Sequence, residues 1–186
     1  MSEWEPLRPG DAAVLLRDLD VPWWIAGGWS LDLFLGEETR AHEDLDVAVL
    51  RRDQRRVFDA LAEWELAGAH DGELTAWSGQ PLPAGCNSVW AKPSGAARWH
   101  LEFVLDESEG DTWRYRRDMR VTRPLTSIGP TGGPQPPEVT LLYKARDAGH
   151  EDDWDVVAPK LDAAARTWLA DAVAVAHPES PYRGRL

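Results

Sequence analysis

The 186-residue sequence contains little cysteine and no long apolar run. Its single cysteine, Cys86, excludes an intrachain disulfide and any cysteine-rich zinc site. No stretch approaches the roughly 18 apolar residues that a membrane-spanning helix needs. The N-terminus lacks the basic and apolar regions of a signal peptide. We therefore expect a cytoplasmic protein that does not contact a membrane.

Basic residues are also scarce. Twenty Lys and Arg residues stand against 32 Asp and Glu residues, which gives a net charge of -12. Nucleic-acid binding needs a basic stripe, so this charge argues against a nucleic-acid partner. An acidic protein favours a cationic small ligand, but the composition bias of an acidic proteome explains the same charge. Both interpretations stay open, because net charge by itself reports on solubility and steering.

The segment from Trp23 to Leu50 has the most informative pattern of the chain. Apolar residues typical of a strand lead into Gly27 and Gly28, and an amphipathic stretch follows as far as Gly36. Glycines at a strand-to-helix turn let a ligand approach the backbone closely. The N-terminus of the following helix offers free N–H groups to phosphate. The pattern therefore predicts a phosphate site at this turn.

Two aspartates, Asp44 and Asp46, open the apolar strand that ends the segment. The two-residue period of a strand places both side chains on one face. Neighbouring carboxylates repel each other, which raises a pKa unless a cation neutralises them. Carboxylate oxygens, together with substrate phosphates, are the usual ligands of Mg²⁺. The pattern therefore predicts a divalent-metal site.

In this order the two motifs, G-G-W-S-L-D and G-E-E-T-R-A-H-E-D-L-D-V-A-V, resemble the aminoglycoside and lincosamide nucleotidyltransferases. These enzymes, which include the aminoglycoside 2''-adenylyltransferases, are a branch of the DNA polymerase β-type superfamily. The family signature is a Gly-Gly or Gly-Ser pair and a spaced Asp-x-Asp, and here fifteen residues separate Gly28 from Asp44. The resemblance implies an α+β fold with a mixed-sheet, polymerase β-like palm core flanked by helices. It also implies two Mg²⁺ ions held by Asp44 and Asp46, and a triphosphate cradled by Gly27, Gly28, Trp29 and Ser30.

A third carboxylate is expected, because the acceptor hydroxyl must lose its proton and align with the α-phosphorus. In the strand predicted over 98–105, Glu102 lies between apolar neighbours, where a charge is costly to bury unless it meets a cation. The matching family position bears an Asp or Glu that acts as metal ligand or general base, so the resemblance gives Glu102 these roles. Asp106 is the alternative, although a turn residue at the end of the strand is the simpler interpretation of it.

Two cations are candidates for phosphate binding. Arg40 lies in the T-R-x-H string before the aspartates, where it could also pair with a neighbouring carboxylate. Lys144 lies on a helix predicted over 138–148, and the resemblance implies that it contacts the nucleotide phosphates. Asp152 and Asp155 follow with family-like spacing, but a solvated helix face explains them nearly as well.

Periodicity and turn residues predict the remaining elements. We expect helices over 12–19 and over 53–66, the second with Val57, Leu61 and Trp64 at helical spacing, and then short strands between 74 and 124. A Gly/Pro-rich connector over 129–137 precedes three helices, the last over 162–176, and a loosely ordered tail from 178. The predicted division is a nucleotidyltransferase core over 1–128 and a helical segment over 137–177. Both belong to one compact protein, as a monomer or a homodimer.

The resemblance implies a Mg²⁺-dependent transfer of AMP from ATP to a hydroxyl of a small, possibly cationic molecule. Aminoglycosides are polycations that suit an acidic cleft, whereas lincosamides suit a tryptophan-lined one, and the sequence contains residues for both. Two alternatives remain. One is nucleotidyl transfer to a protein or a metabolite, and the other is a non-catalytic binding protein with the same fold. Against the second, a binding protein does not need Asp44, Asp46 and Glu102 together.

Overall fold

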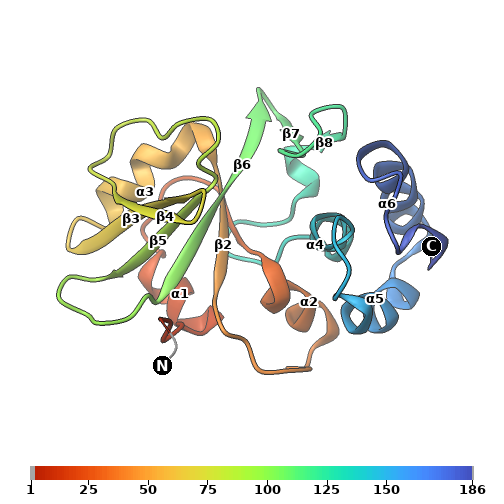
Figure 1. Ribbon diagram of the computed structural model, residues 1–186, viewed down its shortest axis with the longest axis horizontal. Coiled ribbons are helices and arrows are strands. Elements are labelled where there is room, and N and C mark those ends of the chain that lie inside the picture. Colours follow the sequence, from red (N-terminus) through yellow and green to blue (C-terminus); the bar gives the residue numbers. More distant parts are fainter. Residues whose placement is uncertain (1–2, 186) are drawn as a thin grey trace.

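A mixed eight-stranded sheet forms the centre of the protein, which the computed structural model describes over residues 3–185. The strands are β1 (Trp23–Ile25), β2 (Asp46–Leu50), β3 (Trp64–His70), β4 (Glu73–Ala76), β5 (Ser88–Pro93), β6 (Leu101–Glu109), β7 (Thr112–Arg114) and β8 (Thr122–Pro124). Their order is β1-β2-β6-β5-β3-β4, and β7 and β8 extend from β6 (Figure 1). Strands β2 and β6 are parallel, and the other paired strands are antiparallel.

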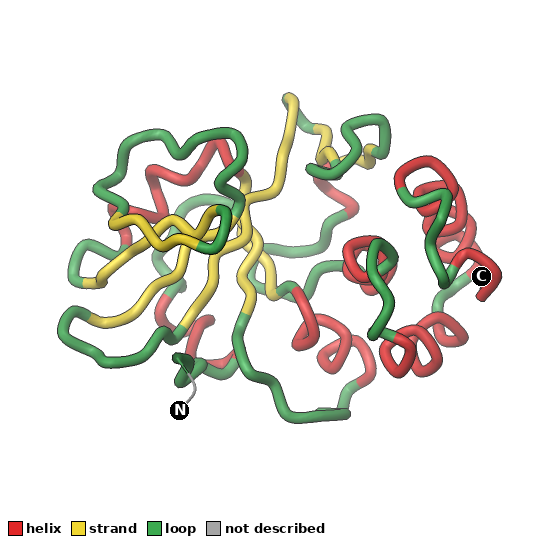
Figure 2. The backbone as a smooth tube through the Cα atoms, in the orientation of Figure 1, coloured by secondary structure: helices red, strands yellow, loops and turns green. Residues whose placement is uncertain are grey.

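Six α-helices flank the sheet within the described residues. They are α1 (Pro9–Leu15), α2 (Gly27–Leu35), α3 (Gln54–Ala60), α4 (Pro137–Lys144), α5 (Glu151–Val157) and α6 (Ala163–Ala176). Helices α4 to α6 gather at one end of the molecule and the β3–β4–β5 part of the sheet lies at the other (Figure 1). The tube view shows the same arrangement (Figure 2). The α+β prediction is confirmed, whereas the division at residues 128 and 137 stays a prediction.

Local sequence explains where two of the helices begin. Helix α4 has a proline in its first turn, where the missing N–H costs nothing. Helix α6 begins after Asp162, whose carboxylate accepts a hydrogen bond from the amide of Ala165 at 2.8 Å. Over residues 3–185, no helix is long and apolar enough to cross a membrane.

The side-chain alternation of β2 divides the core in two. Val47 and Val49 pack into the cluster that contains residues of α1 and α3. Ala48 and Leu50 pack on the opposite face, into the cluster that contains residues of α2, α4, α5 and α6. Asp46 shares the face of Ala48. The sheet therefore presents Asp46 toward the side on which α2 and α4 lie.

The helix predicted over 53–66 is wrong in its second half. Helix α3 ends at Ala60, and Trp64 begins strand β3 instead of continuing the helix. Strand β3 pairs with both β4 and β5, which satisfies its backbone on two sides. Asp71 and Gly72, both with positive φ, form the two-residue turn between β3 and β4.

The prediction of a loosely ordered tail is also wrong. Tyr182 is fully buried, and its ring stacks on Trp154 with a centroid distance of 4.9 Å. The backbone N–H of His150 donates to the Tyr182 hydroxyl at 2.8 Å. The tail therefore packs onto α5, because a buried aromatic ring contributes a large apolar area.

Candidate active site

Three carboxylates converge where the parallel strands β2 and β6 lie side by side. Asp44, Asp46 and Glu102 each offer an oxygen, and these oxygens lie within 4.8 Å of one another. Asp46 and Glu102 are direct neighbours in the β2–β6 register, so they share a face. Asp44 is exposed, and the other two residues are half-buried. The structure thus brings together the three carboxylates that the sequence singled out.

This cluster has the electrostatics of a cation site. Removal from water, and then the charges of Glu102 and Asp44, hold the pKa of Asp46 well above its ordinary value, against the lowering effect of Lys144 and Arg116. Desolvation also raises the pKa of Glu102, although its Oε1 accepts a hydrogen bond from the Ser88 hydroxyl at 2.7 Å, which acts in the opposite direction. Hard oxygen ligands that repel one another fit a divalent cation such as Mg²⁺.

The glycine pair lies against this cluster. Gly27, the first residue of α2, has φ +59°, and a Cβ there would overlap Oδ2 of Asp46. A Cβ on Gly28 would lie 2.7 Å from Nη2 of Arg40 and 2.8 Å from the ring of His42. Both positions therefore need glycine, and the first amides of α2 lie beside the carboxylates. Such amides have no acceptor within their own helix and are available to phosphate.

Replacing Gly27 by alanine is expected to lower activity by about 10²-fold, because the new Cβ displaces Asp46 by the order of an ångström. The left-handed backbone adds a cost of about 1–2 kcal/mol to the folded state. Gly36→Ala is the matched control, because Gly36 has φ +78° and open space around its missing Cβ. Pyrophosphate release and thermal unfolding of both variants measure the two effects. Equal activity of the two variants would contradict the close approach to Asp46.

The side chains of Trp29 and Ser30 contact other residues of the protein beside the glycine turn. The Trp29 ring stacks on His42 at 4.2 Å, and His42 shares a hydrogen bond of 2.6 Å with Asp32. The Ser30 hydroxyl donates to the Gly27 carbonyl at 2.8 Å and shares a buried hydrogen bond of 2.7 Å with Thr140 of α4. Both side chains are thus engaged within the protein, and their contact with a triphosphate stays a prediction.

Arg40 and Lys144 converge on the mouth of the site. They line a cavity of about 320 Å³ together with Gly27, Gly28 and the Asp44–Asp46 carboxylates. Nζ of Lys144 lies 2.8 Å from Asp153, and Nε of Arg40 lies 3.9 Å from the same carboxylate. These two cations therefore lie at the edge of the cavity that Asp44 and Asp46 line, and their contact with phosphate stays a prediction.

The acidic residue that meets Lys144 is Asp153, one of three consecutive acidic residues at the start of α5. The predicted pair was Asp152 and Asp155. Asp152 is exposed, and Asp155 forms an ion pair with Arg185. Asp152 and Asp155 lie one and two positions from Asp153 on α5. Residues at these spacings point in different directions on a helix, so only Asp153 faces Lys144.

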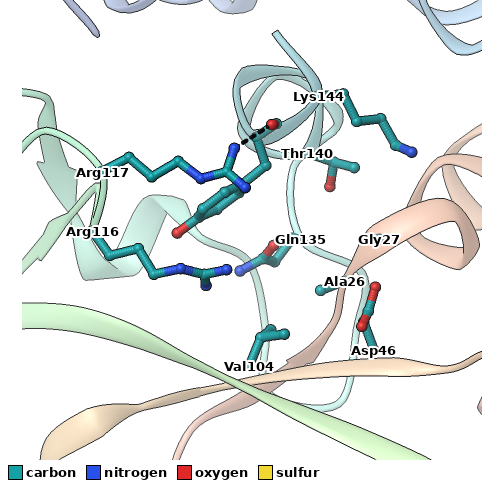
Figure 3. A pocket seen from close by; sticks show the side chains of 10 residues that line it. Ala26, Gly27, Asp46, Val104, Arg116, Arg117, Gln135, Thr140 and Lys144 are labelled. Carbon is teal, nitrogen blue, oxygen red and sulfur yellow. Dashed lines mark hydrogen bonds between the residues drawn. The ribbon is translucent and has the colours of Figure 1, made fainter. Parts of the chain in front are cut away.

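A second cavity, of about 180 Å³, lies between the sheet and α4 (Figure 3). Sequence analysis missed most of the residues that line it. Arg116 lies with its guanidinium 4.7 Å from the centre of the Tyr143 ring, and Nη1 of Arg117 donates to the Tyr143 carbonyl at 2.7 Å. Gln135 lines the same cavity, as do Asp46 and Lys144. The cavity is therefore rich in cations and continuous with the carboxylate cluster.

Asp106 holds this second cavity in shape. It is fully buried, and it accepts hydrogen bonds from Trp113 at 2.9 Å, from Gln135 at 2.8 Å and from Tyr143 at 2.8 Å. Burial raises its pKa, and Arg116, with Nη1 3.7 Å away, acts in the opposite direction. The turn-residue interpretation of Asp106 is wrong, because β6 continues to Glu109. Its place on the Glu102 face was the signal for an inward role.

A glycine turn at the start of a helix, beside three carboxylates on a mixed sheet, defines the nucleotidyltransferase class. Residues 11–75 match the family model described as Aminoglycoside-2''-adenylyltransferase. This range contains the glycine pair, Asp44 and Asp46, whereas Glu102 lies outside it. The predicted family resemblance and the prediction of a nucleotidyltransferase are confirmed by this match.

Two solved structures share the fold. The solution structure of the antibiotic-resistance factor ANT(2'')-Ia is 16% identical, with a TM-score of 0.57 and coverage of 89% of each chain. The crystal structure of ANT(2'')-Ia in complex with adenylyl-2''-tobramycin is also 16% identical, with a TM-score of 0.55 and coverage of 87% of this chain and 92% of that one. No curated protein sequence gives a significant match.

Proposed function

We propose that this protein transfers AMP from ATP to a hydroxyl of an aminoglycoside in a Mg²⁺-dependent reaction. The observation that carries the proposal is the meeting of Asp44, Asp46 and Glu102 beside the glycine turn of α2. The match to the aminoglycoside-2''-adenylyltransferase family favours an aminoglycoside over a lincosamide as acceptor. The adenylyl-2''-tobramycin bound to ANT(2'')-Ia is the kind of product that such a reaction forms.

The donor nucleotide takes the cation-lined side of the site. Its phosphates meet the first amides of α2 together with Arg40 and Lys144. Lys144 now pairs with Asp153 at 2.8 Å, so a phosphate that binds there replaces that carboxylate as its partner. The sugar and base then extend into the cavity formed by Arg116, Arg117 and Tyr143.

Asp44, Asp46 and Glu102 are the residues that would hold Mg²⁺. When bound, the metal neutralises the triphosphate and the charge that develops on the leaving pyrophosphate. Asp46 and Glu102 suit this task because desolvation and the neighbouring carboxylates raise their pKa values, and a bound cation would offset that repulsion.

Glu102 accepts the proton of the acceptor hydroxyl. The hydroxyl oxygen forms a new bond to the α-phosphorus, the bond from that phosphorus to the β-phosphate oxygen breaks, and pyrophosphate leaves. The Ser88 hydroxyl orients the carboxylate through its hydrogen bond to Oε1. A carboxylate with a raised pKa is a better base near neutral pH than an ordinary one.

Pyrophosphate release from Mg²⁺·ATP tests the proposal. We expect release with tobramycin, none with lincomycin, and none when EDTA removes the metal. Mass spectrometry of the product should show one added AMP. If ATP binds but no aminoglycoside elicits pyrophosphate release, the proposal of an aminoglycoside acceptor is refuted. Transfer to a protein or a metabolite then becomes the proposal to test.

A further inference from the structure

The guanidinium of Arg116 donates no hydrogen bond to any of the described residues 3–185. Its side chain is 18% exposed and lines the second cavity, between the sheet and α4 (Figure 3). Its ion pair with Asp106 spans 3.7 Å, which is longer than a hydrogen bond. A guanidinium has five N–H donors in a planar fork that fits phosphate. These donors are therefore available to an anion that enters the cavity.

The residues around Arg116 fix the direction of its side chain. The guanidinium lies over the ring of Tyr143, 4.7 Å from the ring centre. The preceding residue, Tyr115, is fully buried, and its hydroxyl shares a hydrogen bond of 2.7 Å with His177, so the backbone that carries Arg116 is anchored. Figure 3 shows the Arg116 side chain extending across the cavity toward Gln135. The guanidinium therefore enters the cavity in a defined orientation.

The two oxygens of Asp106 have different partners. Oδ2 accepts hydrogen bonds from Trp113 at 2.9 Å and from Gln135 at 2.8 Å. Oδ1 accepts from the Tyr143 hydroxyl at 2.8 Å and is the oxygen nearest Arg116. Because these hydrogen-bond donors are neutral, they do not balance the negative charge, and a buried charge needs a partner of opposite sign. Asp106 therefore holds both the guanidinium and the ring on which it lies.

The charge of Arg116 also acts on the carboxylate cluster. It lowers the pKa of both Asp46 and Glu102, against the effect of desolvation. Asp46 lines the second cavity as well as the cavity of about 320 Å³ that contains Arg40, so the two cavities meet at this residue. In the proposed reaction the outer phosphates lie beside Arg40 and the sugar lies in the second cavity. The α-phosphate connects them and would therefore lie beside Asp46, on the side that Arg116 lines.

We propose that Arg116 donates hydrogen bonds to the α-phosphate of the bound nucleotide, and that Asp106 is the positioning residue that directs Arg116 to it. The proposal rests on the proposed transfer reaction and adds two residues to it. Arg116 stabilises the negative charge on the non-bridging oxygens of the α-phosphate while the acceptor hydroxyl attacks. Because Asp106 and Tyr143 already orient the guanidinium, this stabilisation needs no rearrangement during the reaction. Asp106 touches no reacting group and acts through Arg116.

Titrations with AMP and with adenosine, followed by NMR, test the phosphate contact without any transfer. AMP contains the α-phosphate and no other phosphate, and adenosine contains none. Arg116→Gln should raise the Kd for AMP about tenfold or more, because it removes charge-assisted hydrogen bonds, and should change the Kd for adenosine less than about twofold. The matched control is Arg123→Gln, since Arg123 forms a similarly buried ion pair with Glu138 at 2.8 Å and lines neither cavity of the nucleotide side.

The control variant should bind AMP and adenosine as the wild type does. Equal affinities for AMP in Arg116→Gln and Arg123→Gln would overturn the proposal, as would an equal loss of affinity for AMP and adenosine in Arg116→Gln. These affinities do not depend on turnover. If the wild type binds AMP but transfers nothing, the proposed function fails, and the phosphate contact is still tested.

Asp106→Asn tests the positioning role. Asparagine keeps one oxygen as an acceptor, but an uncharged amide replaces the oxygen nearest Arg116. We expect kcat to fall about tenfold in Asp106→Asn and about 10²-fold in Arg116→Gln, and the double variant to be no slower than Arg116→Gln alone. Glu138→Gln removes the carboxylate of the control ion pair and should leave kcat unchanged. Losses that add in the double variant would show that Asp106 does not act through Arg116.

Arg116→Lys tests the proposal without a change at the buried aspartate, in case Asp106→Asn does not fold. Lysine keeps the positive charge and can keep the ion pair, but it lacks the planar fork of N–H groups. We expect kcat to fall about tenfold and stability to change little. A wild-type kcat in Arg116→Lys would overturn the directed contact between the guanidinium and the phosphate.

Discussion

Replacing Asp46 by asparagine is expected to abolish AMP transfer and to leave the fold intact or more stable. Asp46 lies between Gly27 and Glu102, so the substitution removes one charge from the centre of the proposed metal site. The loss of a metal ligand and of its charge should lower kcat by about 10³-fold or more.

The free energy of unfolding of Asp46→Asn should stay the same or rise, although its activity falls. Desolvation and the neighbouring carboxylates raise the pKa of Asp46 above its unfolded value, so the ionised group costs stability as the pH rises through that range. Asparagine carries no charge at any pH. At neutral pH the metal-free variant should therefore unfold at the same temperature as the wild type or higher, by about 2–4 °C for each kcal/mol of repulsion removed.

Thermal unfolding with and without Mg²⁺ provides the control for Asp46→Asn. A ligand that binds only the native state raises its stability. Mg²⁺ should therefore stabilise the wild type and Asp171→Asn, and it should have little effect on Asp46→Asn. Wild-type turnover by Asp46→Asn, or equal stabilisation by Mg²⁺, would refute the metal assignment of this residue.

The carboxylates could be found in the sequence because each rests on a local rule. The two-residue period of the predicted strand put Asp44 and Asp46 on one face, although β2 itself begins at Asp46, and a charge among apolar residues identified Glu102. That Asp46 and Glu102 are neighbours depends on the pairing of β2 with β6, which are more than fifty residues apart. The family resemblance supplied this long-range relation, since spacing within a strand cannot.

The positions of the two arginines in the second cavity could not be predicted from local sequence patterns. Arg116 and Arg117 follow β7 in a turn, and their meeting with Tyr143 depends on how β7 and α4 pack. Nothing in the sequence around position 116 distinguishes these two arginines from the other arginines of the chain. Asp106 was interpreted as a turn residue for the same reason, because its partners come from three later segments of the chain.

Strand β3 was missed although the sequence contained a signal for it. Helical spacing of Val57, Leu61 and Trp64 extended the predicted helix, but the dipeptide Asp71-Gly72 is a strong hairpin signal. Weighing the turn over the spacing would have placed a strand on each side of it. The error matters for the site, because β3 pairs with β5, and Ser88 of β5 donates to Glu102.

Replacing Glu102 by glutamine is expected to lower kcat by about 10²-fold and to leave nucleotide binding nearly unchanged. Glutamine has almost the same shape and can still accept the hydrogen bond from Ser88, but it cannot take a proton from the acceptor hydroxyl. Single-turnover rates and the Kd for ATP measure the two effects separately. Equal losses in both would make Glu102 a metal ligand first, and an unchanged kcat would refute the general-base role.

Ser88→Ala also tests Glu102 as general base, because it should change the pKa of Glu102 in a known direction. The hydrogen bond from Ser88 lowers the pKa of Glu102, so its removal raises that pKa further. A general base acts only when deprotonated, and the acid limb of the rate profile should therefore move to higher pH in Ser88→Ala. Activity at high pH should approach that of the wild type, because the carboxylate is then fully ionised in both. An acid limb that stays in place would show that the proton leaves the acceptor by another route than Glu102.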